Sequence, residues 1–217
     1  MTMDHDPLTI VAFGDSITLA GRQPEDRRWP EIVRRSLADR LSDREIRVIN
    51  AGGGGNTSRE GLQRIDQDVC SHAPDIVTVQ FGGNDATPEP ERHVSPGEFR
   101  DNLAQIHARV SHGSACRTAL LTFPPLIDEW HAWNGHEFFS HDGGINAYIH
   151  RYRNAVLDYA AAHSLPVADI HGLLQSAIDR DGPEPYILPD GVHLTEQANG
   201  LVAERVTEAI LEMEGVG

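Results

Sequence analysis

Short apolar runs alternate along the chain with longer segments in which apolar residues recur every three or four positions. The short runs predict strands at residues 8–13, 47–50, 75–81, 117–123 and 166–168. The longer segments predict helices at residues 29–41, 58–70, 96–110, 145–163 and 195–213. Strands separated by helices of this length need crossover connections, so we expect an α/β fold whose five-stranded sheet is mostly parallel, with helices on both faces.

Residues 124–144 follow neither pattern. This segment holds the large aromatic side chains Trp130, Trp133, Phe138 and Phe139 among polar residues and glycines. Long irregular connections in compact domains are usually functional or disordered, and the aromatic content argues against disorder. We therefore interpret these four aromatics either as packing under a long loop or as walls of a substrate pocket, with Trp130, Trp133 and Phe138 as the candidate substrate-binding residues. No linker or low-complexity tract divides the chain, so we expect residues 1–217 to form a single domain.

Chemically distinctive residues follow the ends of the predicted strands. Ser16 comes after the first strand, the run Gly52–Gly55 after the second and Asn84 after the third, while Asp190 and His193 precede the last helix. In open α/β sheets, ligands collect beyond the carboxyl ends of the strands. We therefore expect these side chains to meet at one edge of the sheet.

This combination contains the groups that acyl transfer needs. A serine hydroxyl becomes a good nucleophile when a base such as His193 takes its proton, and a carboxylate such as Asp190 holds the imidazole in the correct tautomer. The oxyanion formed on an ester carbonyl needs preorganised donors. The backbone N–H of Ser16, an N–H from the glycine run and the side-chain amide of Asn84 are the candidates.

The same residues resemble the sequence blocks of the SGNH (GDSL-type) hydrolase family. Four matching segments occur in the family's order: Gly14-Asp15-Ser16-Ile17, Gly55, Gly82-Gly83-Asn84-Asp85 and Asp190-Gly191-Val192-His193. The resemblance spans nearly the whole chain and implies a flavodoxin-like, three-layer α/β/α sandwich.

Residue by residue, the resemblance implies that Ser16 is the nucleophile and that Asp190 and His193 complete the triad. It also implies that Ser16, Gly55 and Asn84 form the oxyanion hole. The expected function is therefore hydrolysis of carboxylic esters through an acyl-enzyme.

A narrower similarity concerns the substrate. Residues 81–86, 93–103 and 124–130 resemble the isoamyl acetate-hydrolysing esterase branch of the family, although the run Gly52–Gly55 is richer in glycine than that branch. The resemblance implies short, acetyl-type acyl groups. Two alternatives stay open: O-deacetylation of a carbohydrate or glycoside, and a non-catalytic ligand-binding module that keeps this fold.

The charge of the chain excludes some partners. There are 18 basic residues, all of them arginine, against 33 acidic residues, and the formal net charge is −15. Such a protein repels phosphate backbones and anionic membranes, so we expect neither nucleic acid nor a membrane as a partner, and a monomer or small homo-oligomer that acts on a small ester. The missing lysine fits either coding bias or adaptation to high salt.

The remaining features suggest no cofactor and a reducing compartment. His131, His136, His141 and His150 are not spaced one helical turn apart, so we expect no metal, and the absence of lysine rules out a P-loop. The chain has only two cysteines, and residues 1–6 lack an apolar signal core. Together these observations predict a cytoplasmic protein without an organic cofactor.

Overall fold

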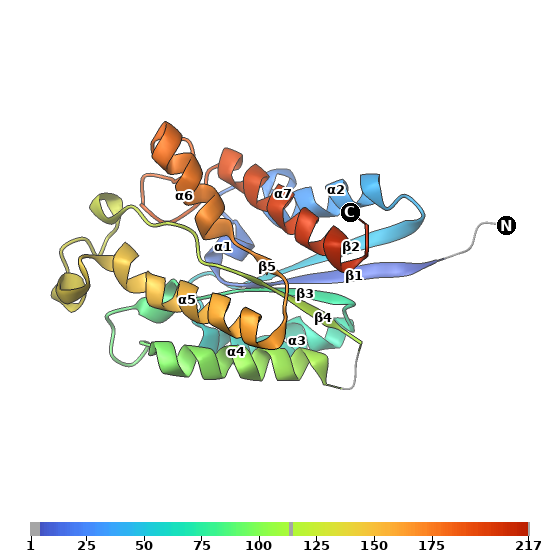
Figure 1. Ribbon diagram of the computed structural model, residues 1–217, viewed down its shortest axis with the longest axis horizontal. Coiled ribbons are helices and arrows are strands. Elements are labelled where there is room, and N and C mark those ends of the chain that lie inside the picture. The colour runs from blue at the N-terminus through green and yellow to red at the C-terminus, as the bar shows by residue number, and fades with distance from the viewer. Residues whose placement is uncertain (1–4, 113–114, 217) are drawn as a thin grey trace.

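A computed structural model describes residues 5–112 and 115–216. Its strands run parallel in one sheet in the order β2-β1-β3-β4-β5 (Figure 1). The bounds are β1 (His5–Gly14), β2 (Arg44–Gly52), β3 (Ile76–Gln80), β4 (Arg117–Leu121) and β5 (Val167–Ala168). This is the flavodoxin-like strand order, so the predicted fold class is confirmed.

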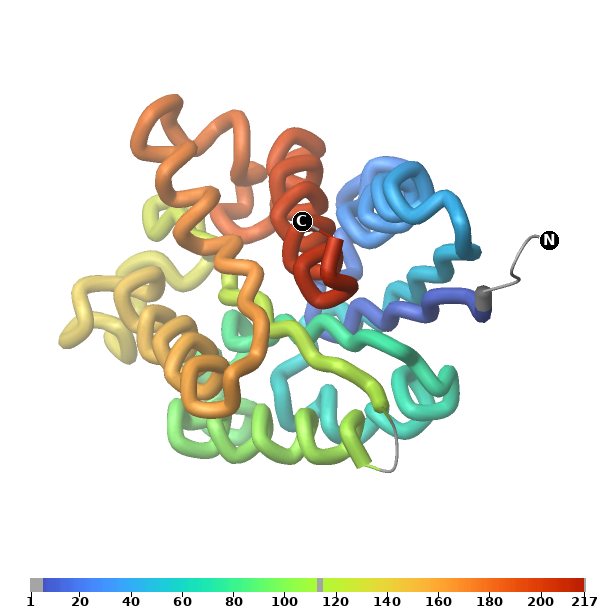
Figure 2. The backbone as a smooth tube through the Cα atoms, turned by 45° about the vertical axis from the view of Figure 1, so that its right-hand side comes forward, coloured from blue at the N-terminus to red at the C-terminus, as the bar shows by residue number. Residues whose placement is uncertain are grey.

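The helices form a layer on each face of the sheet. One layer contains α2, α6 and α7, and the other contains α3, α4 and α5 (Figures 1 and 2). Their bounds are α1 (Ser16–Leu19), α2 (Trp29–Arg40), α3 (Ser58–Asp68), α4 (Pro96–Ser111), α5 (Ile145–His163), α6 (Ile170–Asp181) and α7 (Glu196–Met213). Because both faces are covered, every residue of the central strand β3 is buried.

Helix α6 is the main element that the hydrophobic pattern did not predict. Asp169 caps it, and its side chain accepts a hydrogen bond from Gly172 N at 3.1 Å. The buried residues Ile170, Leu174 and Ala177 have helical spacing. The signal was therefore present, but it is short and it includes a glycine in the first turn, which weakens helix propensity.

Short 3₁₀ helices order several of the connections. They are η1 (Glu25–Arg27), η2 (Cys70–His72), η3 (Asn84–Ala86), η4 (Asp128–Trp130) and η5 (Glu137–Asp142). The last two lie within the irregular segment 124–144. There Phe139 is buried and stacks on Trp133, with ring centroids 6.2 Å apart. The segment is thus a folded loop.

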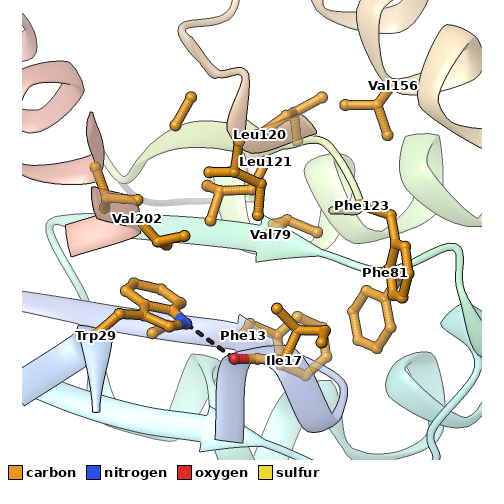
Figure 3. Close-up of a cluster of buried hydrophobic side chains, with 14 of the residues drawn as sticks. Phe13, Ile17, Trp29, Val79, Phe81, Leu120, Leu121, Phe123, Val156 and Val202 are labelled. Atoms are coloured by element: carbon orange, nitrogen blue, oxygen red, sulfur yellow. Dashed lines mark hydrogen bonds between the residues drawn. The ribbon is translucent and has the colours of Figure 1, made fainter. Parts of the chain in front are cut away.

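The buried core supports the residues that follow β1. Phe13 packs edge-on against Phe81, with centroids 5.1 Å apart, and Trp29 donates its indole N–H to the carbonyl of Ile17 at 3.0 Å (Figure 3). Trp29 is almost fully buried. The short helix that begins at Ser16 is therefore held by the core.

Within the described ranges, every helix is too short or too polar to cross a bilayer. Cys70 and Cys116 are half-buried and are not joined by a disulfide. Residues 1–4, which carry most of the expectation about the amino terminus, lie outside the described residues.

Candidate active site

Three side chains from opposite ends of the chain meet beyond the carboxyl end of β1. His193 Nε2 lies 3.1 Å from Ser16 Oγ, and His193 Nδ1 lies 2.7 Å from Asp190 Oδ2. These distances fit a hydrogen-bonded chain from carboxylate to imidazole to hydroxyl. The residues that the sequence selected as nucleophile, base and acid are thus brought together.

The turn between Asp190 and His193 sets the direction of both side chains. The second carboxylate oxygen of Asp190, Oδ1, accepts hydrogen bonds from Val192 N at 3.0 Å and His193 N at 2.9 Å. Gly191 adopts a positive φ of 74°, and a Cβ there would lie 2.7 Å from the carbonyl oxygen of Ile127. Only glycine fits this conformation and this close approach.

The protonation of Asp190 follows from its contacts. Partial burial alone would raise its pKa, but the hydrogen bonds from His193 N, from the His193 ring and from Val192 N together hold the pKa of this carboxyl below its usual range. Asp190 is therefore ionised at neutral pH. An ionised carboxylate is the form that orients an imidazole and stabilises an imidazolium.

The candidate oxyanion donors come from the loops after β2 and β3. Gly55 has a positive φ of 74°, and its carbonyl accepts a hydrogen bond from Arg92 at 2.7 Å. Asn84 donates one amide hydrogen to the carbonyl of Asn56 at 3.1 Å, which leaves its second amide hydrogen available. Among the described residues, the N–H groups of Ser16 and Gly55 donate to no protein acceptor.

Arg64 joins these loops, and sequence reasoning missed it. Its guanidinium donates to the carbonyls of Gly14 at 2.7 Å and Ala51 at 2.8 Å, and to Asn56 Oδ1 at 2.7 Å. It also lies over the Phe13 ring, 4.8 Å from the centroid. One cation thus ties the ends of β1 and β2 to the glycine loop. In the sequence it is an ordinary helix arginine with no local signal.

Asp15 lies directly beneath the site. Its carboxylate is fully buried, accepts from Ile17 N at 2.8 Å and receives the Gln80 amide at 3.3 Å. Burial raises the pKa of Asp15 to about 7, against the lowering effect of these hydrogen bonds. Asp15 caps the first turn of α1, which positions Ser16.

Asp85 has a comparable structural role in the loop after β3. It accepts hydrogen bonds from Ser58 N at 3.0 Å and Gly82 N at 3.2 Å, so it joins the start of α3 to the loop that carries Asn84. Burial raises the pKa of this carboxyl to about 6. Its partners are structural groups, which fits a loop-capping residue.

The three candidate aromatic residues of the loop lie apart from the cavity that contains Ser16. That cavity is shallow, with a volume of about 10 Å³, and its lining residues are Ser16, Ile17, Ala20, Arg22, His193, Leu194 and Asn199. Trp130 instead lines an apolar cavity of about 260 Å³ with Ile187, Leu188 and Pro189. No tryptophan therefore closes the Ser16 cavity directly.

Trp133 and Phe138 lie further out in the same loop. Trp133 lines a cavity of about 340 Å³ formed within the loop, and the partly exposed Phe138 packs edge-on against His93 and Tyr148. Within the described residues, no group of three or more histidine, cysteine or acidic side chains is placed to hold a metal.

A buried arginine anchors the start of the loop. Arg153 donates to the carbonyls of Phe123 at 2.9 Å and Pro124 at 2.5 Å, and to Asn146 Oδ1 at 2.8 Å. Burial lowers the pKa of this guanidinium to about 9. The Asp190 turn is attached to the same segment, because Ile127 N donates to the carbonyl of Gly191 at 3.0 Å.

The strand order and the cluster at the sheet edge define a hydrolase of the flavodoxin-like α/β/α class. The family model described as GDSL-like lipase/acylhydrolase matches residues 10–206, and the chain belongs to this family. The sequence-based family assignment is therefore confirmed, and the protein is a carboxylic ester hydrolase.

Individual relatives are moderately similar over nearly their full length. A GDSL esterase/lipase of Arabidopsis thaliana is 31% identical over 218 residues, covering 94% of this chain and 85% of that protein. The Bacillus subtilis protein named uncharacterized lipoprotein YqeF is 26% identical over 223 residues, covering 92% and 88%. The crystal structure of a lipase/acylhydrolase from Enterococcus faecalis superposes with a TM-score of 0.77 at 26% identity, covering 94% and 96%.

Proposed function

We propose that this esterase works through an acyl-enzyme on Ser16, with His193 as base and Asp190 as the orienting carboxylate. The continuous contact from Asp190 Oδ2 to His193 Nδ1 at 2.7 Å and from His193 Nε2 to Ser16 Oγ at 3.1 Å carries this proposal. A serine within hydrogen-bond reach of an imidazole, itself oriented by a carboxylate, is the arrangement that activates a hydroxyl.

Acylation follows from the geometry. Ser16 Oγ attacks the ester carbonyl while its proton passes to His193 Nε2, and the carbonyl oxygen becomes an oxyanion. The N–H groups of Ser16 and Gly55 and the free amide hydrogen of Asn84 receive that charge. Collapse of the tetrahedral intermediate breaks the bond to the leaving alcohol oxygen, and His193 gives that oxygen the proton it took from Ser16.

Deacylation repeats the sequence with water. His193 takes a proton from water, the resulting hydroxide attacks the acyl-enzyme, and the carboxylic acid leaves as Ser16 recovers its proton. Asp190 stays ionised throughout and stabilises the imidazolium, in keeping with its lowered pKa.

The preferred acyl group is short in this proposal. The sequence similarity of residues 81–86, 93–103 and 124–130 to acetate-hydrolysing esterases supports this preference. Each extra methylene changes binding by only roughly 1 kcal/mol, so a sharp loss of rate beyond about six carbons must come from steric closure.

A chain-length series tests this proposal. Rates on 4-nitrophenyl esters from acetate upward should fall sharply, and Trp130→Ala or Trp133→Ala should relax the limit by loosening the loop beside the Asp190 turn. Leu157→Ala, an exposed residue of α5, is the control. A wild-type profile in both tryptophan variants contradicts the role of the loop. Absence of labelling by a fluorophosphonate probe contradicts an activated serine and favours a binding module.

A further inference from the structure

We propose that Arg22 is a specificity-determining residue that binds a carboxylate on the leaving-alcohol half of the ester. The inference rests on the proposed role of Ser16 and names the class of substrate: esters of hydroxy acids or of other alcohols that carry an acidic group. Arg22 lies outside the four sequence blocks that carry the family resemblance.

Arg22 stands at the edge of the proposed catalytic residues. It lines the cavity shared by Ser16 and His193, and its Nη2 is 3.9 Å from Asp190 Oδ2, the oxygen that faces the imidazole. That distance is too long for a hydrogen bond. The Arg22 side chain is 63% exposed, so its N–H groups are open to a ligand.

The backbone that carries Arg22 is clamped against the His193 segment. Ala20 ends α1 in the left-handed conformation with φ of 49°, and Gln23 N donates to its carbonyl at 3.0 Å. The Gln23 side chain then donates to the carbonyl of Leu194 at 3.1 Å. The position of Arg22 relative to His193 is therefore set by contacts on both sides.

Arg22 differs from most arginines of this chain, whose guanidinium groups are engaged. Arg34 pairs with Glu31, for example, and Arg153 donates to backbone carbonyls. Within the described residues, only the guanidinium groups of Arg22, Arg40 and Arg100 donate no hydrogen bond, and Arg40 and Arg100 are exposed on α2 and α4. Arg22 is thus the one arginine with open donors that lines the Ser16 cavity.

Protonation of the leaving oxygen by His193 determines which half of the ester lies near Arg22. The carbonyl oxygen faces Gly55 and Asn84, whereas the leaving oxygen must lie near His193 Nε2 to be protonated. Arg22 is on the His193 side, so a carboxylate several bonds beyond the leaving oxygen falls within its reach. A guanidinium fits a carboxylate with two parallel hydrogen bonds.

The net charge of −15 opposes anions at long range, but the local cation acts at contact distance. At physiological salt the Debye length is about 8 Å, so charges elsewhere on the exposed surface are largely screened. The carboxylate oxygen 3.9 Å from Arg22, Asp190 Oδ2, is already hydrogen-bonded to His193.

A matched pair of acetyl esters tests the assignment. The ratio of kcat/KM for 4-acetoxybenzoate over neutral 4-acetoxybenzamide is measured in 0.15 M salt for the wild type and for Arg22→Gln, Arg22→Lys and Arg40→Gln. For a partly exposed ion pair we expect the ratio to fall about fivefold in Arg22→Gln, mostly through KM, and to recover partially in Arg22→Lys. Arg40→Gln, the control, should keep the wild-type ratio.

Each other outcome overturns the inference. An unchanged ratio in Arg22→Gln contradicts a contact between Arg22 and the substrate carboxylate. An equal loss of rate on both esters shows that Arg22 acts through Asp190. A second pair of esters, phenyl hydrogen glutarate and neutral phenyl butyrate, differs by a carboxylate on the acyl half. An effect of Arg22→Gln that is confined to this second pair contradicts the assignment of Arg22 to the leaving half. Ser16→Ala with full activity on both acetyl esters contradicts the proposed nucleophile instead, so the two failures are distinguishable.

Discussion

Asp190 and Asp15 each lie close in sequence to a proposed catalytic residue, yet their surroundings are opposite. The Asp190 side chain is 37% exposed, and hydrogen bonds hold its pKa below the usual range, whereas Asp15 is fully buried and its pKa rises to about 7. The ionised carboxylate at the rim can stabilise an imidazolium. The buried carboxyl of Asp15 instead caps the turn that carries Ser16. Environment, rather than distance along the chain, separates the two roles.

Loss of the nucleophile should have the largest effect. We expect Ser16→Ala to lower kcat by roughly 10⁵-fold or more, because the hydroxyl is the reacting group. The free energy of unfolding should change by only about 1 kcal/mol, since a single hydrogen bond is lost. Rates on an activated acetyl ester and the urea midpoint measure the two effects; equal rates for variant and wild type contradict the mechanism.

Substitutions of His193 and Asp190 should have the next largest effects. His193→Ala should cost about as much as Ser16→Ala, because triad members act as a unit, and Asp190→Asn should cost less, roughly 10⁴-fold in kcat. The wild-type rate should fall as pH drops, since the imidazole must be neutral to accept a proton. An Asp190→Asn variant with wild-type kcat would remove the distinction between the two aspartates.

The oxyanion side gives a smaller effect. Asn84→Ala should lower kcat by roughly 10²–10³, the loss expected for one donor, while KM changes little because the amide bonds the transition state more strongly than the ground state. A variant altered only in KM would identify Asn84 as a substrate-binding residue.

Asp15→Asn should have the smallest effect on activity and a characteristic effect on stability. In the wild type, the Thr18 hydroxyl donates to Gln80 Oε1 at 3.0 Å. In the variant, rotation of the Gln80 amide by 180° turns its oxygen towards the new amide of residue 15, where it accepts a hydrogen bond. The Gln80 amide nitrogen then faces the Thr18 hydroxyl, which becomes the acceptor. Because the folded-state pKa of Asp15 is raised to about 7, the contribution of this group to stability is fully present below its unfolded pKa and is lost as pH rises towards about 7.

The measurement is the urea midpoint of wild type and Asp15→Asn between about pH 4 and 8. The variant should gain stability relative to wild type as pH rises to about 7 and then level off. Asp39→Asn, at an exposed position on α2, is the control and should follow the wild-type curve. Parallel curves for Asp15→Asn and wild type contradict the burial of a titrating carboxyl.

The sequence predicted much of this arrangement because short motifs carry it. Ser16, Asn84, Asp190 and His193 sit at strand ends or in a tight turn, where residue type and position follow from local rules. Arg64 and Arg153 were missed for the opposite reason: their partners are carbonyls far away in sequence, and nothing near either arginine marks it. Helix α6 was missed because its apolar pattern is short.

The aromatic loop was the hardest segment to interpret. Its composition identified Trp130, Trp133 and Phe138 as candidates. It did not predict the direction of their side chains, because that direction depends on contacts with the Asp190 turn and with α5. The structure places Trp130 in a cavity next to that turn and Trp133 in one formed within the loop. A role for these aromatics in binding substrate stays a prediction.

The two ends of that loop meet at its base. Leu126 N donates to Asn146 Oδ1 at 3.1 Å, Asn146 N donates to Asp128 Oδ1 at 2.8 Å, and Ile127 N reaches the carbonyl of Gly191. The segment between these hydrogen bonds is a loop whose two ends lie side by side. Protein engineers can therefore replace the exposed residues 134–138 by segments of other lengths to reshape substrate choice. Trp130 and His131, which pack against Gly191, and the buried Phe139 then stay in place beside the hydrogen bonds of the base.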